Sequence, residues 1–293
     1  MNLKCVINRL GKVALVWRIK PRGDETLVVT HHHLQRSSFE ERYGHVSVSM
    51  VMPAFNVSDN IFQSILQAKE SLQRFTPDYE IVVVDDGSRD HTAAIIASMK
   101  DDRVKLIRNS VNHGKGFSVI KGVGHATGDY VIMCDADAEI GSRELERYLW
   151  QLRDCDMVIS SKRDPLSSYD APFTRKFLSA GFNKLVWIMT GLRMSDTQTG
   201  LKAFRRKPLN NIIRLVLVKR YAFDTELLVL AKLLKLRVAE APVVVVQRMG
   251  FRAGDALRMF VDLCGISYRL RITRWYQKNL AGMAPEDLIE TWR

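Results

Sequence analysis

Short apolar runs alternate with amphipathic helical segments between residues 46 and 160, and this alternation constrains the fold more than any other sequence feature. The runs are predicted to be buried strands and cover Val46–Met52, Tyr79–Val84, Val104–Ile107, Tyr130–Cys134 and Asp156–Ser160. Strands that alternate with helices across short loops are typical of a mostly parallel sheet with helices on both faces. We therefore predict an α/β fold of this kind.

The helix after the first strand has the clearest periodicity. The first strand is expected to stop at Pro53, and Ser58 or Asp59 can cap the helix. The residues predicted to line its buried face are Ile61, Ile65, Ala68, Leu72 and Phe75. Further helices are predicted over 90–99, 116–126, 173–189, 224–235 and a long basic stretch from about 254 to 276, with a loop at 195–200 and a strand at 243–246.

The composition limits both the size of the fold and the partners. The 293 residues suffice for one large α/β domain or two small ones, and 46% of them are hydrophobic, which excludes a disordered chain. The formal net charge of +12 indicates an anionic partner, such as nucleic acid, a phosphorylated substrate or an anionic membrane surface. Four widely spaced cysteines without a CxxC pair argue against a disulfide scaffold or structural zinc and favour a reducing compartment.

Residues 1–45 differ in character from the rest and are predicted to be an N-terminal extension. Lys12–Lys20 and Thr26–Thr30 flank Pro21-Arg22-Gly23-Asp24 and could pair as a hairpin. Residues 46–250 are predicted to form the catalytic domain and 251–293 a basic amphipathic helical segment. No stretch is predicted to span a membrane, because the most apolar one, Phe177–Leu192, is interrupted by Asn183 and Lys184.

Acidic residues follow two of the predicted strands directly. Asp85 and Asp86 end one strand, and Asp135 and Asp137 end another, with Glu139 continuing the spacing. Carboxyl ends of parallel strands meet at one edge of a sheet, where carboxylates would repel each other unless a cation offsets their charge. Acidic residues are also common turn formers. Two such motifs with a basic glycine loop between them favour a divalent ion that holds a diphosphate.

The glycine loop is Asn112-His113-Gly114-Lys115-Gly116, directly before a predicted helix. Glycines permit close backbone approach, and a helix N-terminus favours anions. The loop is not a Walker motif, because the spacing GxxxxGK[ST] is absent.

Taken together, five motifs resemble glycosyltransferase family 2, whose members have the GT-A fold. They are VMPAFN, VVVDDGSRD, NHGKG, ATGDYVIMCDADAE and DTQTGLKAF. Residues 175–204 and the segment AFDTELL at 222–228 are most similar to the branch that transfers glucose to dolichyl phosphate, with the mannose-transferring branch second. The resemblance covers roughly residues 46–274 and implies a Rossmann-like, mostly parallel sheet followed by C-terminal amphipathic helices.

The resemblance also implies roles for single residues. The donor side would comprise Pro53, Ala54, Phe55, Asp85, Asp86, Lys115, Gly116, Asp135 and the mobile-loop residue Arg248. Mg²⁺ or Mn²⁺ would be held by Asp135, Asp137 and Glu139. The catalytic set would be Asp137, Asp196 and Gln198, with Asp196 and Gln198 on the acceptor side, near the sugar and the reacting phosphate. Lys162 or Arg163, together with Arg175, would bind the phosphate of the lipid. Two departures from the family pattern lie at Phe55-Asn56-Val57 and Gly250-Phe251-Arg252.

The implied function is an inverting transfer of a hexose from UDP-glucose to dolichyl or polyprenyl phosphate, with GDP-mannose as the alternative donor. The enzyme would act peripherally at the cytoplasmic face of a membrane, using either 173–189 or the last helix. The alternatives from other classes are a phospho-receiver, a non-catalytic nucleotide binder and a nucleic-acid-binding protein. Phospho-receiver modules are much shorter. The sequence has no helix-turn-helix, zinc or RNP pattern, so no nucleic-acid partner is expected.

Overall fold

The computed structural model of the protein describes residues 4–7, 13–16, 45–136, 142–169, 173–194, 196–245 and 253–282. The chain divides into two units, residues 1–44 and 45–293. In the first, strands β1 (Lys4–Ile7) and β2 (Val13–Val16) pair antiparallel, with Lys4 opposite Val16. The predicted partner of β2, Thr26–Thr30, lies outside the described residues. Within the described residues β2 pairs with β1, a strand that the sequence analysis did not predict.

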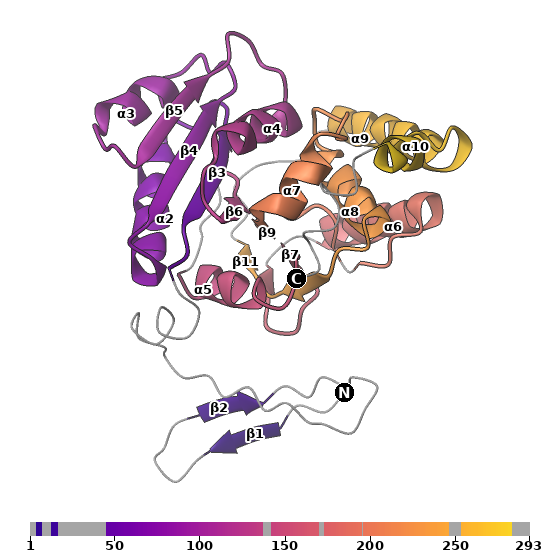
Figure 1. Ribbon diagram of the computed structural model, residues 1–293, viewed down its shortest axis with the longest axis horizontal. Coiled ribbons are helices and arrows are strands. Elements are labelled where there is room, and N and C mark those ends of the chain that lie inside the picture. The colour runs from indigo at the N-terminus through magenta and orange to yellow at the C-terminus, as the bar shows by residue number, and fades with distance from the viewer. Residues whose placement is uncertain are drawn as a thin grey trace. The chain divides into compact units, whose positions relative to one another are not determined.

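A seven-stranded sheet forms the centre of the second unit (Figure 1). Its strand order is β10-β7-β9-β6-β3-β4-β5. The strands are β3 (Val48–Ala54), β4 (Tyr79–Asp85), β5 (Val104–Arg108), β6 (Tyr130–Met133), β7 (Met157–Ser160), β9 (Lys202–Arg205) and β10 (Val238–Ala241). All pairings are parallel except those of β9, which runs antiparallel between β6 and β7. The predicted α/β fold with a mostly parallel sheet is confirmed, and β9 makes the sheet mixed.

Helices cover both faces of this sheet, so its strands are apolar on both sides. Every residue of β4 is buried. On one face Val51, Val82 and Val84 pack with α4 (Lys115–His125) and α8 (Phe223–Leu233) in one core. On the other side α2 (Ile61–Phe75) packs with α3 (Thr92–Ser98) and α5 (Ser142–Gln151).

Helix α2 follows the predicted periodicity. All five residues predicted to face the core are buried. The N-cap of the helix is Asn60 and not the predicted Ser58 or Asp59, so the helix begins at Ile61. The side chain of Asn60 makes no capping hydrogen bond. Asp90 instead accepts the backbone N–H of Ser58 at 3.0 Å, so this turn is bound to the segment before α3.

Strand β3 continues through Pro53, contrary to the prediction that it stops there. Pro53 lies opposite Val84 of β4, whereas the pairing of β3 with β6 ends at Val51. Proline cannot donate a ladder hydrogen bond. It is accommodated because the β6 side of β3 is already unpaired at this position.

The second half contributes the helices that cover the end of the sheet opposite α2 and α3 in Figure 1. They are α6 (Phe173–Thr190), α7 (Arg206–Ile213), α8, α9 (Ala253–Ser267), the π-helical turn η1 (Tyr268–Ile272) and α10 (Trp275–Ala281). A short two-stranded sheet joins β8 (Ser168–Tyr169) to β11 (Val244–Val245). The helix predicted from about 254 to 276 is found as α9 and η1 as far as Ile272, and it is interrupted before α10, where Arg274 adopts a left-handed conformation with φ 52°.

Candidate functional site

Strands β3, β4 and β6 are parallel neighbours, so their carboxyl ends meet at one edge of the sheet. Asp85 and Asp86 lie at this edge and are both buried. Asp85 accepts the backbone N–H of Ser88 at 3.1 Å and pairs with Arg108 at 3.3 Å. Its enclosed carboxylate therefore shapes the turn that follows β4.

Asp86 organises the glycine loop. Its carboxylate accepts the backbone N–H groups of His113 at 3.0 Å and Gly114 at 2.7 Å, and the side-chain amide of Asn109 at 2.8 Å. Three donors from two separate segments thus converge on one buried carboxylate. The first acidic motif and the glycine loop thus form one structural unit.

The turn after β3 is tied to the turn after β4. Asn56 has φ 51°, its backbone N–H donates to Ser88 Oγ at 2.9 Å, and its side-chain oxygen accepts the N–H of Arg89 at 2.9 Å. Asn tolerates this left-handed conformation better than most residues. Beside it Phe55 is 42% exposed, so its ring is free to cover a flat ligand at the edge.

The glycines of the loop at 112–116 serve packing within the protein. Gly114 has φ 104°, and a Cβ there would lie 2.6 Å from the carbonyl oxygen of Lys219. A Cβ on Gly116 would lie 2.7 Å from the carbonyl oxygen of Val218. Close approach of the segment before α8 therefore requires both glycines, and it brings Lys115 beside the N-terminus of α8.

Asp135 follows β6 and is the one carboxylate of the second acidic motif within the described residues. Asp137 and Glu139 lie outside them. Lys115 Nζ is 2.9 Å from Asp135 Oδ1, and the Asp135 side chain is 32% exposed. A Cβ on Gly200 would overlap the Asp135 carboxylate, so the absence of a side chain at Gly200 provides the space that the carboxylate occupies.

The fit of a divalent metal to this edge rests on Asp135. The Asp135 carboxylate is accessible, and Gly200 leaves room for it. Carboxylate oxygens are hard ligands of the kind that bind Mg²⁺ and Mn²⁺. Within the ranges that the structure describes, no three His, Cys, Asp or Glu side chains group closely enough to hold a metal ion. Asp135 therefore fits as one ligand of a set whose other predicted members lie outside those ranges.

Lys115 belongs to a group of four alternating charges, together with Asp135, Asp224 and Lys202, of which Asp224 and Lys202 are buried. Lys115 Nζ lies 3.2 Å from Asp224 Oδ2, and Lys202 Nζ lies 2.7 Å from Asp224 Oδ1. Burial disfavours the ammonium of Lys115, but Asp135 and Asp224 outweigh this and raise its pKa. Burial alone would raise the pKa of Asp224, and the two lysines lower it instead. The pKa of Lys202 is lowered because burial outweighs its partner.

The loop predicted to carry acceptor-side residues lies directly before β9. Asp196 is buried, accepts the backbone N–H of Gln198 at 3.0 Å and lies 3.7 Å from Lys162 Nζ. Gln198 donates to Thr225 Oγ1 at 2.7 Å, which binds the loop to α8. The structure thus brings together two of the predicted site residues, Lys162 and Asp196. Arg163, the next residue in the chain after Lys162, is exposed.

Two predicted cations cannot be placed. Arg175 lies on α6, but its side chain is outside the described residues, as is all of Arg248. Three residues that sequence reasoning missed are Lys202, Asn109 and Thr225, each of which contacts a predicted site residue or its neighbour. Lys202 carried one usable signal, a lysine within an otherwise apolar run LKAF.

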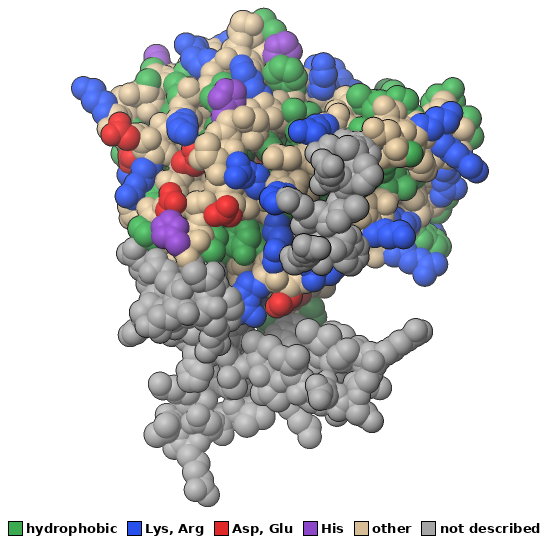
Figure 2. Space-filling view, viewed as in Figure 1, with side chains coloured by type: hydrophobic (Ala, Val, Ile, Leu, Met, Phe, Trp, Pro, Cys, Tyr) green, Lys and Arg blue, Asp and Glu red, His purple; other side chains and the backbone are tan. Residues whose placement is uncertain are grey.

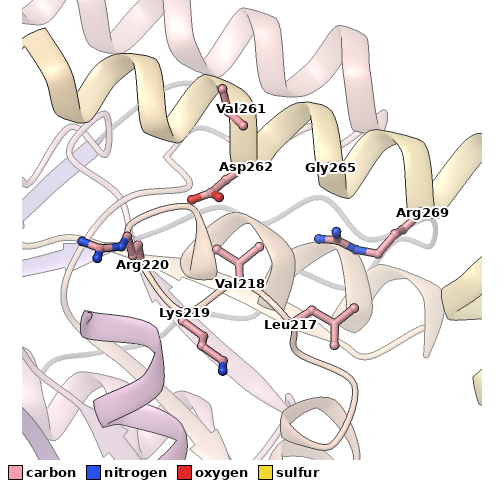
Figure 3. Close-up of a pocket in the computed structure, with 8 residues that line it drawn as sticks. All are labelled: Leu217, Val218, Lys219, Arg220, Val261, Asp262, Gly265 and Arg269. Atoms are coloured by element: carbon pink, nitrogen blue, oxygen red, sulfur yellow. The ribbon is translucent and has the colours of Figure 1, made fainter. Parts of the chain in front are cut away.

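A cavity of about 430 Å³ has a lining that includes none of the strand-end carboxylates (Figure 3). It separates residues 217–220 from α9 and η1, and its charged lining residues are Lys219, Arg220, Asp262 and Arg269. Asp262 points toward Arg220 in this view. Because no predicted site residue lines it, the cavity is not the predicted donor site.

The last helices carry an exposed stripe, here called the C-terminal apolar face, made of Leu257, Phe260, Val261, Tyr268 and Ile272. Trp187 and Ile188 of α6 are also exposed, and Arg271 donates to the carbonyl of Ile188 at 2.8 Å. Figure 2 shows apolar and basic side chains side by side in this region. No helix in the described ranges is both long enough and apolar enough to cross a bilayer.

Comparisons with known proteins identify relatives of this chain. Residues 49–213 match the model of the family described as Glycosyl transferase family 2. A dolichyl-phosphate beta-glucosyltransferase of Trichomonas vaginalis is 31% identical over 83% of this chain and 77% of its own. The protein of that name from Homo sapiens is 30% identical over 67% of this chain and 66% of its own.

Solved structures support the fold. Mannosyl-3-phosphoglycerate synthase from Rubrobacter xylanophilus superimposes with a TM-score of 0.63 at 20% identity, over 81% of this chain and 77% of that one. Glucosyl-3-phosphoglycerate synthase from Mycobacterium tuberculosis, in complex with Mn²⁺, UDP and its product, gives 0.64 at 16% identity, over 82% and 85%. The family model matches more than half of this chain, and the chain therefore belongs to glycosyl transferase family 2.

Proposed function

We propose that this protein transfers glucose from UDP-glucose to dolichyl phosphate with inversion at the anomeric carbon. The observation that carries the proposal is the 31% identity over 83% of the chain to a dolichyl-phosphate beta-glucosyltransferase. The geometry supports it, because acidic strand ends, the glycine loop and the loop of Asp196 and Gln198 surround one edge of the sheet. GDP-mannose remains the alternative donor.

The chemistry requires a stabilised leaving group and an aligned nucleophile. An oxygen of the lipid phosphate forms the new bond to the anomeric carbon, while the bond to the β-phosphate oxygen breaks and its electron pair leaves with UDP. A phosphate monoester has a second pKa near about 6 and is mostly dianionic at neutral pH, so it needs positioning rather than a general base. Lys162, Arg163 and Arg175 are proposed to position it.

On the donor side, Phe55 is proposed to cover the nucleoside base, with Pro53, Ala54, Asp85 and Asp86 forming the wall beside it. Lys115 and the start of α4 are proposed to attract the diphosphate. Asp135, Asp137 and Glu139 are proposed to hold Mg²⁺ or Mn²⁺, which when bound supplies positive charge to the leaving diphosphate. Arg248 is proposed to contact the same diphosphate. Asp196 and Gln198 are proposed to lie near both the transferred sugar and the reacting phosphate of the acceptor.

The acceptor is a membrane lipid, so the enzyme is proposed to act peripherally at a membrane, on its cytoplasmic face. The C-terminal apolar face and the exposed residues of α6 support attachment there. Exposed basic residues of the same C-terminal segment are Arg258, Arg271, Arg274 and Lys278. Amphipathic helices with this composition lie in the plane of an anionic interface. The separation of residues 251–293 from the catalytic domain stays a prediction.

An assay of purified protein with UDP-glucose, GDP-mannose and UDP-N-acetylglucosamine on short polyprenyl phosphates, with and without Mn²⁺, tests the proposal. We expect lipid-linked glucose only with UDP-glucose and metal. Transfer from GDP-mannose alone would establish the alternative, and nucleotide binding without transfer to any acceptor would identify a non-catalytic binder. Arg175→Ala should weaken the use of lipid phosphate, whereas Arg214→Ala, an exposed change at the end of α7, should not.

A further inference from the structure

A fully buried lysine connects the two sides of the proposed site. Lys202 of β9 is 1% exposed; its ammonium donates to Asp224 Oδ1 at 2.7 Å and also to the carbonyl of Thr199. Thr199 follows Gln198 in the acceptor-side loop, and Thr199 Oγ1 donates to the carbonyl of Ser160 at 2.7 Å. Lys202 therefore holds the acceptor-side loop and Asp224 at the same time.

Asp224 extends the connection to the donor side. Its second oxygen accepts from Lys115 at 3.2 Å, and Lys115 reaches both oxygens of Asp135, at 2.9 and 3.2 Å. The four charges come from β9, α8, α4 and the end of β6. A single chain of contacts thus runs from the acceptor-side loop to the carboxylate at the donor edge.

The burial of Lys202 is not explained by stability. β9 lies between β6 and β7, with Lys202 opposite Met133 and Ile159, where an apolar side chain would suit the surroundings. Removing an ammonium and a carboxylate from water is costly, and apolar pairs of similar volume often replace buried ion pairs without loss of stability. The pair therefore calls for another role.

We propose that Lys202 and Asp224 are positioning residues for glycosyl transfer. Asp224 holds Lys115 against Asp135, and Lys202 fixes Asp224 and the backbone of Thr199, so the donor and acceptor groups keep one separation. This inference rests on the proposed function, because a fixed separation matters only if two substrates react across the site. Transfer in a single displacement requires alignment within a fraction of an ångström.

Helix α8 supplies a matched control two residues further on. Glu226 is also buried, but its carboxylate faces the other way and accepts the N–H groups of Leu217 at 2.9 Å and Val218 at 2.7 Å. Tyr276 and Arg269 complete its partners. Figure 3 shows Arg269, which belongs to η1, beside the segment 217–220. A change at Glu226 removes a buried charge from the same helix turn, and Glu226 itself makes none of the contacts that connect Lys202, Asp224, Lys115 and Asp135.

The test compares kcat, both KM values and the melting temperature for four variants. They are Lys202→Met, Asp224→Asn, Glu226→Gln and the double variant Lys202→Met with Asp224→Leu. The single variants Lys202→Met and Asp224→Asn should each lower kcat about 100-fold, with smaller changes in either KM. Glu226→Gln should lower the melting temperature and keep kcat. The double variant should recover the wild-type melting temperature while kcat stays low.

Recovery of kcat together with the melting temperature in the double variant would overturn the inference, since the pair would then serve folding alone. Single variants that fold and keep wild-type kcat would overturn it as well. Failure of the proposed function has a different signature, namely a wild-type protein that transfers no sugar to any lipid phosphate in the same assay.

Discussion

The carboxylate of Asp86 accepts the backbone N–H of Gly114 at 2.7 Å. This bond crosses from the end of β4 to the loop before α4, and a second bond to the N–H of His113 reinforces it. The acidic motif at this strand end therefore sets the conformation of the glycine loop. A donor that binds at the edge meets a loop whose shape is already fixed.

Asp86→Asn is expected to weaken donor binding and to destabilise the fold. Both carboxylate oxygens of Asp86 accept hydrogen bonds from N–H groups, so the amide nitrogen of an asparagine would face a donor in either orientation. A buried donor left unpaired costs about 1–3 kcal/mol. Urea unfolding should show this loss, and calorimetry should show weaker UDP binding. Asp129→Asn, at the exposed start of the strands, is the control and should leave UDP affinity unchanged; equal affinities in both variants would contradict the role of Asp86.

Gly200→Ala is expected to lower metal affinity and turnover while leaving stability largely intact. The added Cβ would displace the Asp135 carboxylate, and the φ of Gly200 is not positive, so alanine suits the backbone. Mn²⁺ binding, measured by the paramagnetic signal of the free ion, should weaken together with kcat. Gly124→Ala in α4 has open space around it, and the better helix propensity should stabilise the protein by up to about 1 kcal/mol. Unchanged Mn²⁺ affinity in the Gly200 variant would exclude Asp135 as a ligand.

Local patterns were sufficient for strands β3 to β7 and for helices α2, α3 and α4, whereas α5 was not predicted. The run 79–84 became β4 and the five apolar positions of α2 became its buried face, because each pattern depends on residues that are close in sequence. Strand β9 was missed, since it is four residues long and begins and ends with a charged residue. Its burial is decided by insertion between β6 and β7, which no local pattern encodes.

The same distinction applies to the site. The loop of Asp196 and Gln198 was predicted from polar residues between apolar segments. Lys202 was missed because its role depends on Asp224, which is remote in sequence and meets it only after α8 packs on the sheet. The break at Arg274 was missed because the apolar periodicity continues through it, whereas the backbone turns to φ 52° there.

Glu80 should make stability depend on pH in the acid range. Burial raises its pKa, but hydrogen bonds from Lys105, Ser49 and Thr127 outweigh this and lower the pKa from 4.5 to about 2. A lowered carboxyl pKa contributes stability above the unfolded value, and this contribution is lost as pH falls from 4.5 toward 2. With allowance for solvent screening it amounts to about 2 kcal/mol.

Glu80→Gln should therefore be less stable than the wild type at neutral pH, and the difference should shrink as the pH is lowered below 4.5. Urea unfolding at several pH values measures both curves. Turnover at neutral pH should be unaffected, because Glu80 lies at the start of β4, at the end away from Asp85. A difference in stability that is constant with pH would show that the carboxylate is not charged in the folded state.

The C-terminal apolar face should determine binding to membranes. Leu257 is 66% exposed and Ile272 71% exposed, so replacing both with serine removes apolar surface without opening the core. Partial insertion of each side chain into an interface is worth about 1–2 kcal/mol, and the double variant should bind vesicles with phosphatidylserine at least about tenfold more weakly. Sedimentation with vesicles measures this, and added salt should weaken the wild type because Arg258 and Lys278 are exposed in the same C-terminal segment. Phe62→Ser on α2 removes an aromatic ring that is 49% exposed at the other end of the sheet and should not change vesicle binding. If the Phe62 variant and the double variant lose the same affinity, attachment depends on general surface hydrophobicity and not on this face.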